Sequence, residues 1–378
     1  MIRSLTSKHR NAAYHRIWAA LFPRYLSTVI TDGKFLATYE KIRERDDTLA
    51  PPTQNWLQDN VTLMNFINQK VKFREPNHSS LFPWLLYKYL KNNTIDNDMD
   101  KYINLLKANH NLVLTGAPGT GKTYLAKKIA EAMGTEFQLV QFHPSYDYTD
   151  FVEGLRPCED GSGFELKNGV FKDFCEKAIK DKSKKFVFII DEINRGELSK
   201  IFGELFFAID PGYRGLYEEG RPRGLVQTQY QNLVESDDVF HEGFYVPENV
   251  YILGTMNDID RGVESMDFAI RRRFAWVEVT AEERASMLDG REWSEQAKAS
   301  MTALNRAIEC KEVGLSRAYH IGPAYYLKLD QYDGDFESLW KYHIKGLLYE
   351  YLRGGRNIDY IIDEILKPAF DEYKNVNN

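Results

Sequence analysis

Short apolar runs recur along the middle of the chain, and each ends where polar residues begin. Three of them are residues 111–115, 186–190 and 251–256. Runs of this length that contain β-branched side chains are typical of strands buried on both faces of a parallel sheet. A helix is expected to begin near Lys122, shortly after the first run. The pattern predicts an α/β core over about residues 96–280.

Two insertions interrupt this core. Residues 161–171 carry glycine-bearing turns around alternating apolar residues, which is the signal of a β-hairpin. Residues 211–247 form a longer excursion that carries Arg214, Arg221 and Arg223. This second insertion is either a surface for neighbouring subunits or a partner, or a solvated loop.

The C-terminal region, residues 281–378, is predicted to be a helical lid. Apolar residues recur there at helical spacing, which gives one apolar stripe. The stripe consists of Leu339, Trp340, His343, Ile344, Leu347, Leu348 and Tyr351. We expect His343 to pack within this stripe and not to act as a ligand.

The N-terminal region, residues 1–95, is predicted to be a small, mainly helical domain. Its apolar stretches 17–22 and 63–67 can pack, and the polar run 92–98 predicts a linker into the core. Residues 1–50 hold nine basic and five acidic side chains. This excess suits either contact with nucleic acid or an ordinary solvated helix face, so the role of the domain stays open.

A glycine-rich octapeptide stands between the first predicted strand and the helix after it. Glycines let the backbone curl so that successive N–H groups point at phosphate oxygens, and the helix N-terminus adds positive potential. The lysine is expected to reach the β- and γ-phosphates, and the threonine hydroxyl to bind Mg²⁺. The sequence therefore predicts a site for a nucleoside triphosphate. The octapeptide, which matches G-x-x-x-x-G-K-T, consists of Gly116, Ala117, Pro118, Gly119, Thr120, Gly121, Lys122 and Thr123.

Polar residues follow the second and third predicted strands. The carboxyl ends of parallel strands open into the ligand crevice of such folds, so these residues are expected beside the phosphates. Asp191 and Glu192 follow the second run. Asp191 is placed to hold Mg²⁺, and Glu192 to polarise the attacking water. Asn257, after the third run, can orient that water, although a turn residue that ends the strand is the alternative.

Three consecutive arginines, Arg271, Arg272 and Arg273, lie between apolar residues further along. Arginine offers planar donors suited to phosphate oxygens, so a neighbouring subunit could insert one of them into this subunit's site as an arginine finger. The alternatives are a solvated basic turn and a patch for nucleic acid.

Composition is that of an ordinary globular protein. The 378 residues predict two or three packed units, and 43% hydrophobic with 28% charged residues exclude an extended disordered chain. A net charge of -6 argues against wholesale wrapping of nucleic acid. The three cysteines form no C-x-x-C pair, which favours reduced thiols. No segment approaches the roughly 18 apolar residues of a membrane span, so we expect a cytoplasmic protein.

Four segments, in this order, resemble the McrB family of AAA+ nucleoside triphosphatases, the motor subunits of modification-dependent restriction systems. The segments are residues 140–151, 190–195, 256–261 and 269–274. The likeness covers about residues 100–370. It implies an AAA+ P-loop core with a parallel sheet, a helix-2 insert hairpin that projects into a ring pore, and a helical lid.

The resemblance also implies roles for residues around the triphosphate. Asn257 is expected to act as sensor 1, while Asn194 and Arg195 extend the Walker B region that contains Asp191 and Glu192. Relatives of this family prefer GTP, so the resemblance favours GTP over ATP. The sequence shows no Asn-Lys-x-Asp element of the kind that reads guanine, and the identity of the base stays open.

Further implied roles concern assembly and partners. Arg272 and Arg273 are expected to act in trans across a subunit interface, and Asp260 and Arg261 to couple hydrolysis to the ring and to a partner. The family implies a hexameric ring, a separate McrC-like nuclease and, as a possible target, DNA. The sequence carries no nuclease motif, so cleavage is expected from the other polypeptide.

Two departures from the family pattern bear on these roles. Residues 258–259 are Asp-Ile where the family has Thr-Ala, which adds a negative charge near the γ-phosphate. Residues 321–326 read Ile-Gly-Pro-Ala-Tyr-Tyr where the family has Ile-Gly-His-Ser-Tyr-Phe. Because the His and Ser contribute a lid contact in the family, whether this lid makes that contact stays open.

Two other functions stay open at this level. One is a MoxR-like ATPase that remodels a protein client, although the segment 256–261 argues against it. The other is a nucleotide-regulated binding module with little turnover. The favoured interpretation is a ring-forming GTPase or ATPase that drives a nuclease in defence against foreign DNA.

Overall fold

The computed structural model describes residues 22, 25–27, 32–53, 55–215, 217–218, 220–259 and 268–377. The chain divides into two compact units, residues 1–101 and residues 102–378. Each unit is described by itself below. The boundaries expected near residues 95 and 280 stay predictions.

The first unit is helical in its described part. It contains α2 (Asp32–Arg45), α3 (Trp56–Lys70) and the first part of α4 (Pro76–Asn109). Asn55 caps α3, because its side chain accepts a hydrogen bond from the backbone N–H of Gln58. The small core of this unit consists of Phe35, Tyr39, Leu49, Leu63 and Ile67.

The segment 92–98, expected as a linker marked by loop residues, is helical because α4 continues through it. The division between the two compact units falls just after it, between Lys101 and Tyr102. The run Asn-Asn-Thr-Ile-Asp-Asn-Asp contains neither glycine nor proline. Its residues lower helix propensity only modestly, and nothing in it breaks the backbone pattern of a helix. The apolar stretch 17–22 lies almost wholly outside the described residues, so the expectation for it stays a prediction.

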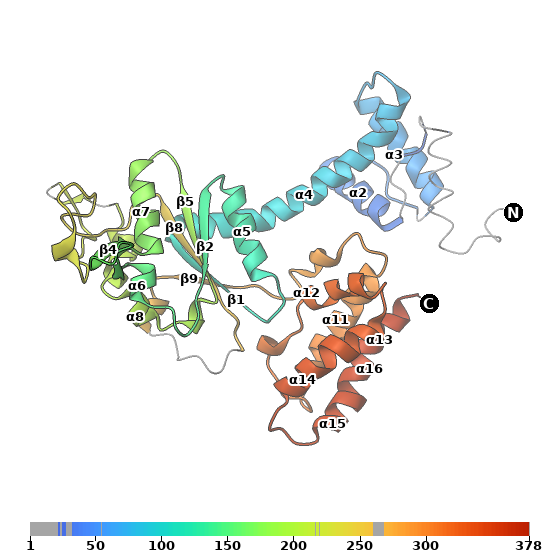
Figure 1. Cartoon of the computed structure of the whole chain (residues 1–378). Helices are drawn as coiled ribbons and strands as arrows, with labels where there is room; N and C mark the ends of the chain where they lie inside the picture. The colour runs from blue at the N-terminus through green and yellow to red at the C-terminus, as the bar shows by residue number, and fades with distance from the viewer. Residues whose placement is uncertain are drawn as a thin grey trace. The chain divides into compact units, whose positions relative to one another are not determined.

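The second unit is built on a five-stranded parallel sheet in the order β2-β5-β8-β1-β9 (Figure 1). The three predicted strands are confirmed as β1, β5 and β8, which form the buried interior of this sheet. The two edge strands, β2 and β9, are less buried and were not predicted. The five strands are β1 (Asn111–Thr115), β2 (Glu136–Gln141), β5 (Phe186–Asp191), β8 (Val250–Thr255) and β9 (Ala275–Glu278).

Helices pack against this sheet around an aromatic core. The phosphate loop leads into α5 (Lys122–Ala132), which contacts β1, β5 and β8. The helix α7 (Val170–Lys180) packs on β5 and contributes Phe171, whose ring stacks on that of Phe151 at a centroid distance of 4.8 Å. Short helices complete the core: α6 (Tyr148–Phe151), α8 (Leu198–Phe202), α9 (Leu205–Ala208) and α10 (Phe268–Arg271).

The predicted hairpin is present as an antiparallel pair, β3 (Glu153–Pro157) and β4 (Phe164–Asn168). It stands between α6 and α7, and Leu155 lies opposite Leu166 across the pair. Phe164, near the turn, is 70% exposed. The helix-2 insert is therefore confirmed as a hairpin, and its place in a ring pore stays a prediction.

The second insertion is partly built into the core, which differs from both expectations for it. It forms the short pair β6 (Tyr217–Glu218) and β7 (Arg221–Pro222). Arg214 is buried, and its guanidinium donates hydrogen bonds to the carbonyl oxygens of Ile209 and Val250 and to Oδ1 of Asn111. Arg214 therefore cross-links the insertion to the sheet and does not form a partner surface.

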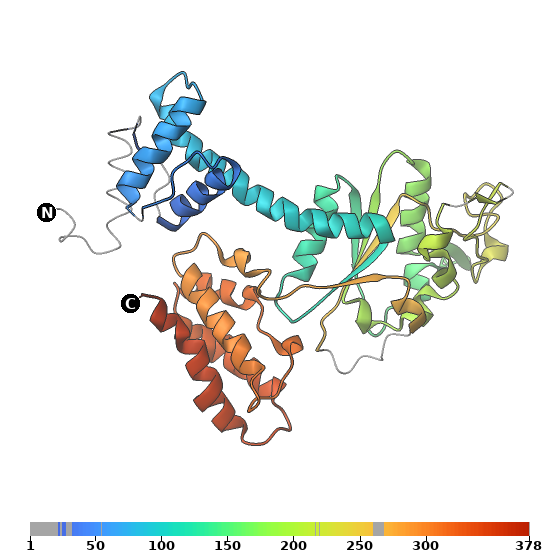
Figure 2. The same cartoon turned by 180° about the vertical axis from the view of Figure 1, so that it is seen from behind.

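The C-terminal region is helical, as predicted, and its helices run side by side (Figure 2). Leu339, Trp340, Ile344 and Leu348 of the predicted stripe are buried, and His343 contacts the hydroxyl of Tyr332 at 2.8 Å. Two turns are π-helical, residues 340–344 and 361–366. The lid helices are α11 (Ser294–Ile308), α12 (Pro323–Tyr326), α13 (Phe336–Leu339), α14 (Lys345–Tyr351), α15 (Ile358–Tyr360) and α16 (Lys367–Phe370).

Within the described part of the chain, none of the helices combines the length and the apolar character that crossing a bilayer requires.

Candidate triphosphate-binding site

The phosphate loop joins β1 to α5 through three glycines with positive φ. Their φ angles are +138° at Gly116, +77° at Gly119 and +77° at Gly121. Residues with a Cβ rarely adopt such angles, so the glycines give the loop a curl that other residues would resist. Gly121 is also the N-cap of α5, so the positive end of that helix lies at the loop.

Lys122 is folded into the loop. Its side chain is buried, and Nζ donates hydrogen bonds to the carbonyl oxygens of Gly116 at 3.0 Å and Ala117 at 2.8 Å. An ammonium held by carbonyl oxygens can exchange these partners for phosphate oxygens, which carry more negative charge. The position of Lys122 therefore fits the expected phosphate contact.

Asp191 joins the loop to the neighbouring strand. Its Oδ1 accepts hydrogen bonds from the hydroxyl of Thr123 at 2.7 Å and from the hydroxyl of Thr255 at 2.6 Å. A hydroxyl and a carboxylate are the hard oxygen ligands that Mg²⁺ prefers, so this pair fits a magnesium ion that also binds the triphosphate. Thr255, at the end of β8, is a site residue that sequence reasoning missed. The feature of the sequence that could have identified Thr255 is its position at the carboxyl end of a predicted central strand.

Glu192 lies next to this pair in a strained backbone conformation. Its φ is +53°, in the left-handed region that residues with a Cβ seldom occupy. Its Oε1 accepts a 2.8 Å hydrogen bond from Nδ2 of Asn257, and its Oε2 lies 3.4 Å from Nε of Arg195. The structure thus brings together Glu192, Asn257 and Arg195 as the sequence led us to expect.

Asn194 is also near this group in the chain, on the turn of residues 193–195. It is buried, and its Oδ1 has no hydrogen-bond partner within the described residues. The structure places its side chain inside the fold, whereas Arg195 beside it is about half exposed.

The three arginines differ in their surroundings. Arg271 lies over the ring of Trp276 at 5.0 Å, and Arg273 donates from Nη1 to the carbonyl oxygen of Ala269 at 2.5 Å. The Arg273 side chain is only 11% exposed and lies 3.7 Å from Asp210. Arg272, between them, is exposed. Asp260 and Arg261, expected to couple hydrolysis to the ring, lie outside the described residues.

Asp258 stands beside the loop, as its place in the sequence suggested. Its backbone N–H donates to the carbonyl oxygen of Gly116 at 3.3 Å. Burial raises the pKa of its carboxyl group, and the charge of Glu278 adds to this effect, while the cations of Lys122 and Arg317 oppose it. The carboxyl group is therefore harder to ionise than an ordinary aspartate.

The lid reaches the phosphate loop through its backbone. The N–H of Gly322 donates to the carbonyl oxygen of Pro118 at 3.1 Å, and the N–H of Ala324 donates to that of Gly119 at 2.9 Å. The lid therefore contacts the phosphate loop in this chain although the His and Ser of the family pattern are absent.

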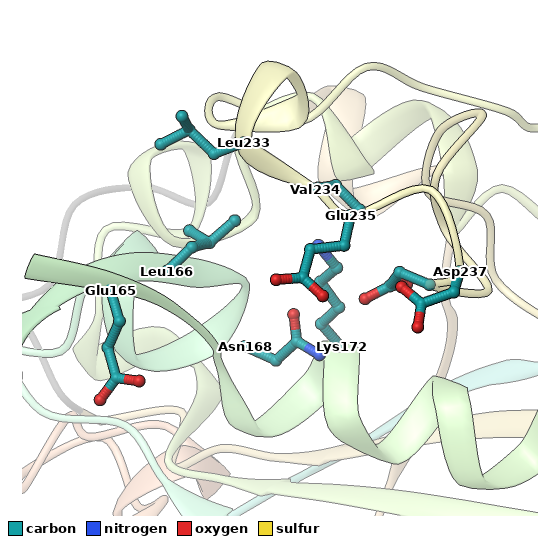
Figure 3. A pocket seen from close by; sticks show the side chains of 9 residues that line it. Glu165, Leu166, Asn168, Lys172, Leu233, Val234, Glu235 and Asp237 are labelled. Atoms are coloured by element: carbon teal, nitrogen blue, oxygen red, sulfur yellow. The ribbon is translucent and has the colours of Figure 1, made fainter.

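A cavity of about 530 Å³ lies elsewhere in this unit, between β4, α7 and residues 233–238 (Figure 3). Lys172 lines it and forms a buried ion pair with Glu153 at 2.5 Å. The other charged side chains of its lining are all acidic, namely Glu165, Glu235, Asp237 and Asp238. None of the triphosphate-site residues lines it.

Comparison with known proteins agrees with this geometry. The model of the AAA domain of the dynein-related subfamily matches residues 111–274, and that of the McrB alpha-helical lid domain matches residues 296–358. The EcoKMcrB subunit of the type IV methyl-directed restriction enzyme of Escherichia coli K12 is 38% identical over 229 residues. That alignment covers 57% of this chain and 47% of the relative.

A second relative is component YdiS of the type II restriction enzyme BsuMI from Bacillus subtilis 168. It is 26% identical over 219 residues, which cover 50% of this chain and 63% of the relative. The chain thus spans about half to two thirds of the length of these two relatives.

The sheet order, the phosphate loop and the acidic residues at the end of β5 define a P-loop nucleoside triphosphatase of the AAA+ class. The helical lid and the identity to the EcoKMcrB subunit narrow the assignment. The chain belongs to the McrB family.

Proposed function

We propose that this chain hydrolyses a nucleoside triphosphate, GTP in preference to ATP, as the ring-forming motor of a DNA restriction or antiviral defence complex. A separate McrC-like nuclease would cut the target. The observation that carries the hydrolysis step is the joint placement of Asp191, Glu192 and Asn257 next to the phosphate loop. The choice of GTP rests on the family resemblance alone.

In this proposal the chain's own groups share the work of phosphoryl transfer to water. Lys122 and the loop N–H groups bind the β- and γ-phosphates. Thr123 and Asp191 would hold Mg²⁺, which neutralises phosphate charge when bound. Glu192 accepts the proton of the attacking water while the oxygen of that water forms a bond to the γ-phosphorus. The bond between the γ-phosphorus and the bridging oxygen of the β-phosphate breaks, and the nucleoside diphosphate leaves. Asn257 orients Glu192 and the water.

The remaining roles depend on assembly. We propose that a hexameric ring places Arg272 of one subunit at the γ-phosphate of the next, since Arg272 is exposed, whereas Arg273 is largely buried. Arg273 would then support the position of Arg272. Asp260 and Arg261 are proposed to couple hydrolysis to the ring and to the partner, and Asn194 and Arg195 to complete the Walker B region.

One assay tests this function. Phosphate release is measured with GTP and with ATP, in the presence and absence of the protein encoded beside this one. The proposal expects faster release from GTP, and stimulation by the neighbour. Release from ATP alone would refute the nucleotide preference. No release under any condition would favour the nucleotide-regulated binding module.

A further inference from the structure

The lid holds the phosphate loop by two main-chain hydrogen bonds. The N–H groups of Gly322 and Ala324 donate to the carbonyl oxygens of Pro118 and Gly119, at 3.1 and 2.9 Å. In a trans peptide, the C=O and the N–H of one unit point in opposite directions. By fixing these two carbonyls, the lid also turns the N–H groups of Gly119 and Thr120 away from itself. Inward-pointing N–H groups are what a phosphate loop uses to bind phosphate.

The fit at Gly322 leaves no room for a side chain. A Cβ built on Gly322 would lie 2.2 Å from the carbonyl carbon of Gly119 and 2.4 Å from the backbone nitrogen of Thr120. These are main-chain atoms, which cannot rotate away as a flexible side chain can. The backbone of Gly322 itself is extended, with φ -79° and ψ 162°, so alanine would be tolerated there but for this contact.

Side chains of the C-terminal region also pack against two glycines of the phosphate loop. The ring of Tyr325 would lie 2.7 Å from a Cβ on Gly119, and Sδ of Met287 would lie 3.0 Å from a Cβ on Gly121. Both glycines therefore pack directly against these side chains, so a change in the shape of the loop would disturb this packing.

The connection from the sheet to the lid meets the remaining glycine. The carbonyl oxygen of Val279 would lie 2.4 Å from a Cβ on Gly116. The N–H of Val279 donates to the carbonyl oxygen of Thr115 at 2.8 Å. All three glycines of the phosphate loop are thus in contact with residues that follow β9.

We infer that residues 322–325, the lid clamp, hold the phosphate loop in its phosphate-binding conformation, and that Gly322 is a positioning residue for triphosphate binding. The inference rests on the proposed nucleotide binding at this loop. Because coupling between two sites is reciprocal, a bound triphosphate must in turn hold the lid clamp against the loop. The lid can therefore report the state of the phosphate site through the main-chain hydrogen bonds of Gly322 and Ala324.

The first test compares Gly322→Ala with Gly346→Ala in the full chain. A Cβ on Gly346 would meet nothing within 4 Å, so this variant is the matched control. Binding of a fluorescent GTP or ATP analogue with Mg²⁺ is measured, together with the thermal unfolding midpoint and steady-state hydrolysis. We expect Gly322→Ala to raise Kd and KM at least tenfold with kcat changed less than threefold, and Gly346→Ala to match the wild type. A Kd within twofold of wild type for Gly322→Ala would overturn the inference.

A second test does not depend on the folding of that variant. Hydrogen exchange of residues 321–326 is followed in the wild type with and without Mg²⁺ and nucleotide, and in Tyr325→Ala and Tyr325→Phe. We expect nucleotide to slow exchange there at least threefold in the wild type and in Tyr325→Phe, and to have less effect in Tyr325→Ala. Unchanged exchange in a wild type that binds nucleotide refutes the clamp. A wild type that binds no nucleotide refutes the proposed function instead.

Discussion

The hydroxyl of Thr123 lies 2.7 Å from Oδ1 of Asp191, which joins the first turn of α5 to the carboxyl end of β5. The two residues are 68 positions apart in the chain. Their meeting ties the phosphate loop to the acidic end of a central strand. The same carboxylate oxygen also accepts the hydroxyl of Thr255, so three elements converge on one atom. This convergence supports the proposed binding of a triphosphate together with Mg²⁺ at this point.

Replacing Thr123 by valine tests this contact. Valine keeps the shape of threonine but removes the hydroxyl, so one oxygen ligand and one hydrogen bond are lost. We expect the affinity for Mg²⁺–nucleotide to fall about 10- to 100-fold, while affinity measured in EDTA changes little. Isothermal titration with each nucleotide checks this. Thr62→Val on α3, where the hydroxyl donates to the carbonyl oxygen of Gln58, is the control and should bind as the wild type does.

Glu192→Gln should separate nucleotide binding from hydrolysis. The amide keeps the size of the carboxylate and cannot accept the proton of the attacking water, so we expect turnover to fall about 10²- to 10⁴-fold. Nucleotide affinity should stay within about threefold, because glutamine keeps the size of the side chain and its amide oxygen can still accept the hydrogen bond from Nδ2 of Asn257. Phosphate release and binding are measured on the same preparation. The surface variant Glu131→Gln is the control and should turn over as the wild type does. Full turnover in Glu192→Gln would show that Glu192 is not the general base.

A mixing experiment tests whether Arg272 acts on a neighbouring subunit. Arg272→Ala and Glu192→Gln should each be inactive alone while both bind nucleotide. In a mixed ring, some sites pair an intact Glu192 with an intact Arg272 from the next subunit, so mixing the two variants should restore part of the activity. Activity that does not return on mixing, although mixed assemblies form, contradicts the claim of action in trans. The exposed Arg353 supplies the control variant Arg353→Ala, which should keep full activity.

Arg273 should behave differently from Arg272. Its guanidinium is largely buried against Ala269 and Asp210, so Arg273→Ala is expected to lower the thermal midpoint as well as activity. Arg272→Ala should leave the midpoint unchanged. Equal midpoints for both variants would mean that the burial of Arg273 contributes nothing to stability.

The central strands and the phosphate loop could be predicted from the sequence because their signals are local. An apolar run of five residues and a glycine pattern need no distant partner to be recognised. The edge strands were missed because one flank of each has no partner strand, so their apolar content is lower. We expected Arg214 on a surface because it lies in a polar insertion. The sequence does not show that its guanidinium is buried and donates hydrogen bonds to main-chain carbonyl oxygens. The lid clamp could not be predicted from the sequence, because its hydrogen bonds are made by main-chain atoms, which every residue type has.

Asp258→Asn should strengthen triphosphate binding. A carboxylate beside the loop repels the γ-phosphate, and the amide removes that charge, so we expect Kd to fall a few-fold at neutral pH and less at high salt. The pKa of Asp258 is raised by burial, so its proton is retained to higher pH than in an exposed aspartate. Lowering the pH toward that pKa neutralises the group, so the advantage of the asparagine variant should shrink. An advantage that stays constant as the pH falls contradicts this account.

The buried pair of Lys172 and Glu153 should matter more to stability than any surface pair. Both side chains are almost fully buried, and the other carboxylate oxygen of Glu153 accepts the N–H of Tyr230 at 2.9 Å. Lys172→Met leaves a carboxylate buried without its cation, so we expect about 3–5 kcal/mol loss in the free energy of unfolding. Urea unfolding measures it.

Two controls decide whether the loss comes from the uncompensated charge. Adding Glu153→Gln to Lys172→Met removes that charge while keeping an oxygen for Tyr230, so the double variant should recover part of the stability. Lys128→Met breaks the exposed pair with Glu131 and should leave the urea midpoint nearly unchanged. A double variant no more stable than Lys172→Met would mean that the uncompensated charge of Glu153 is not the cause of the loss.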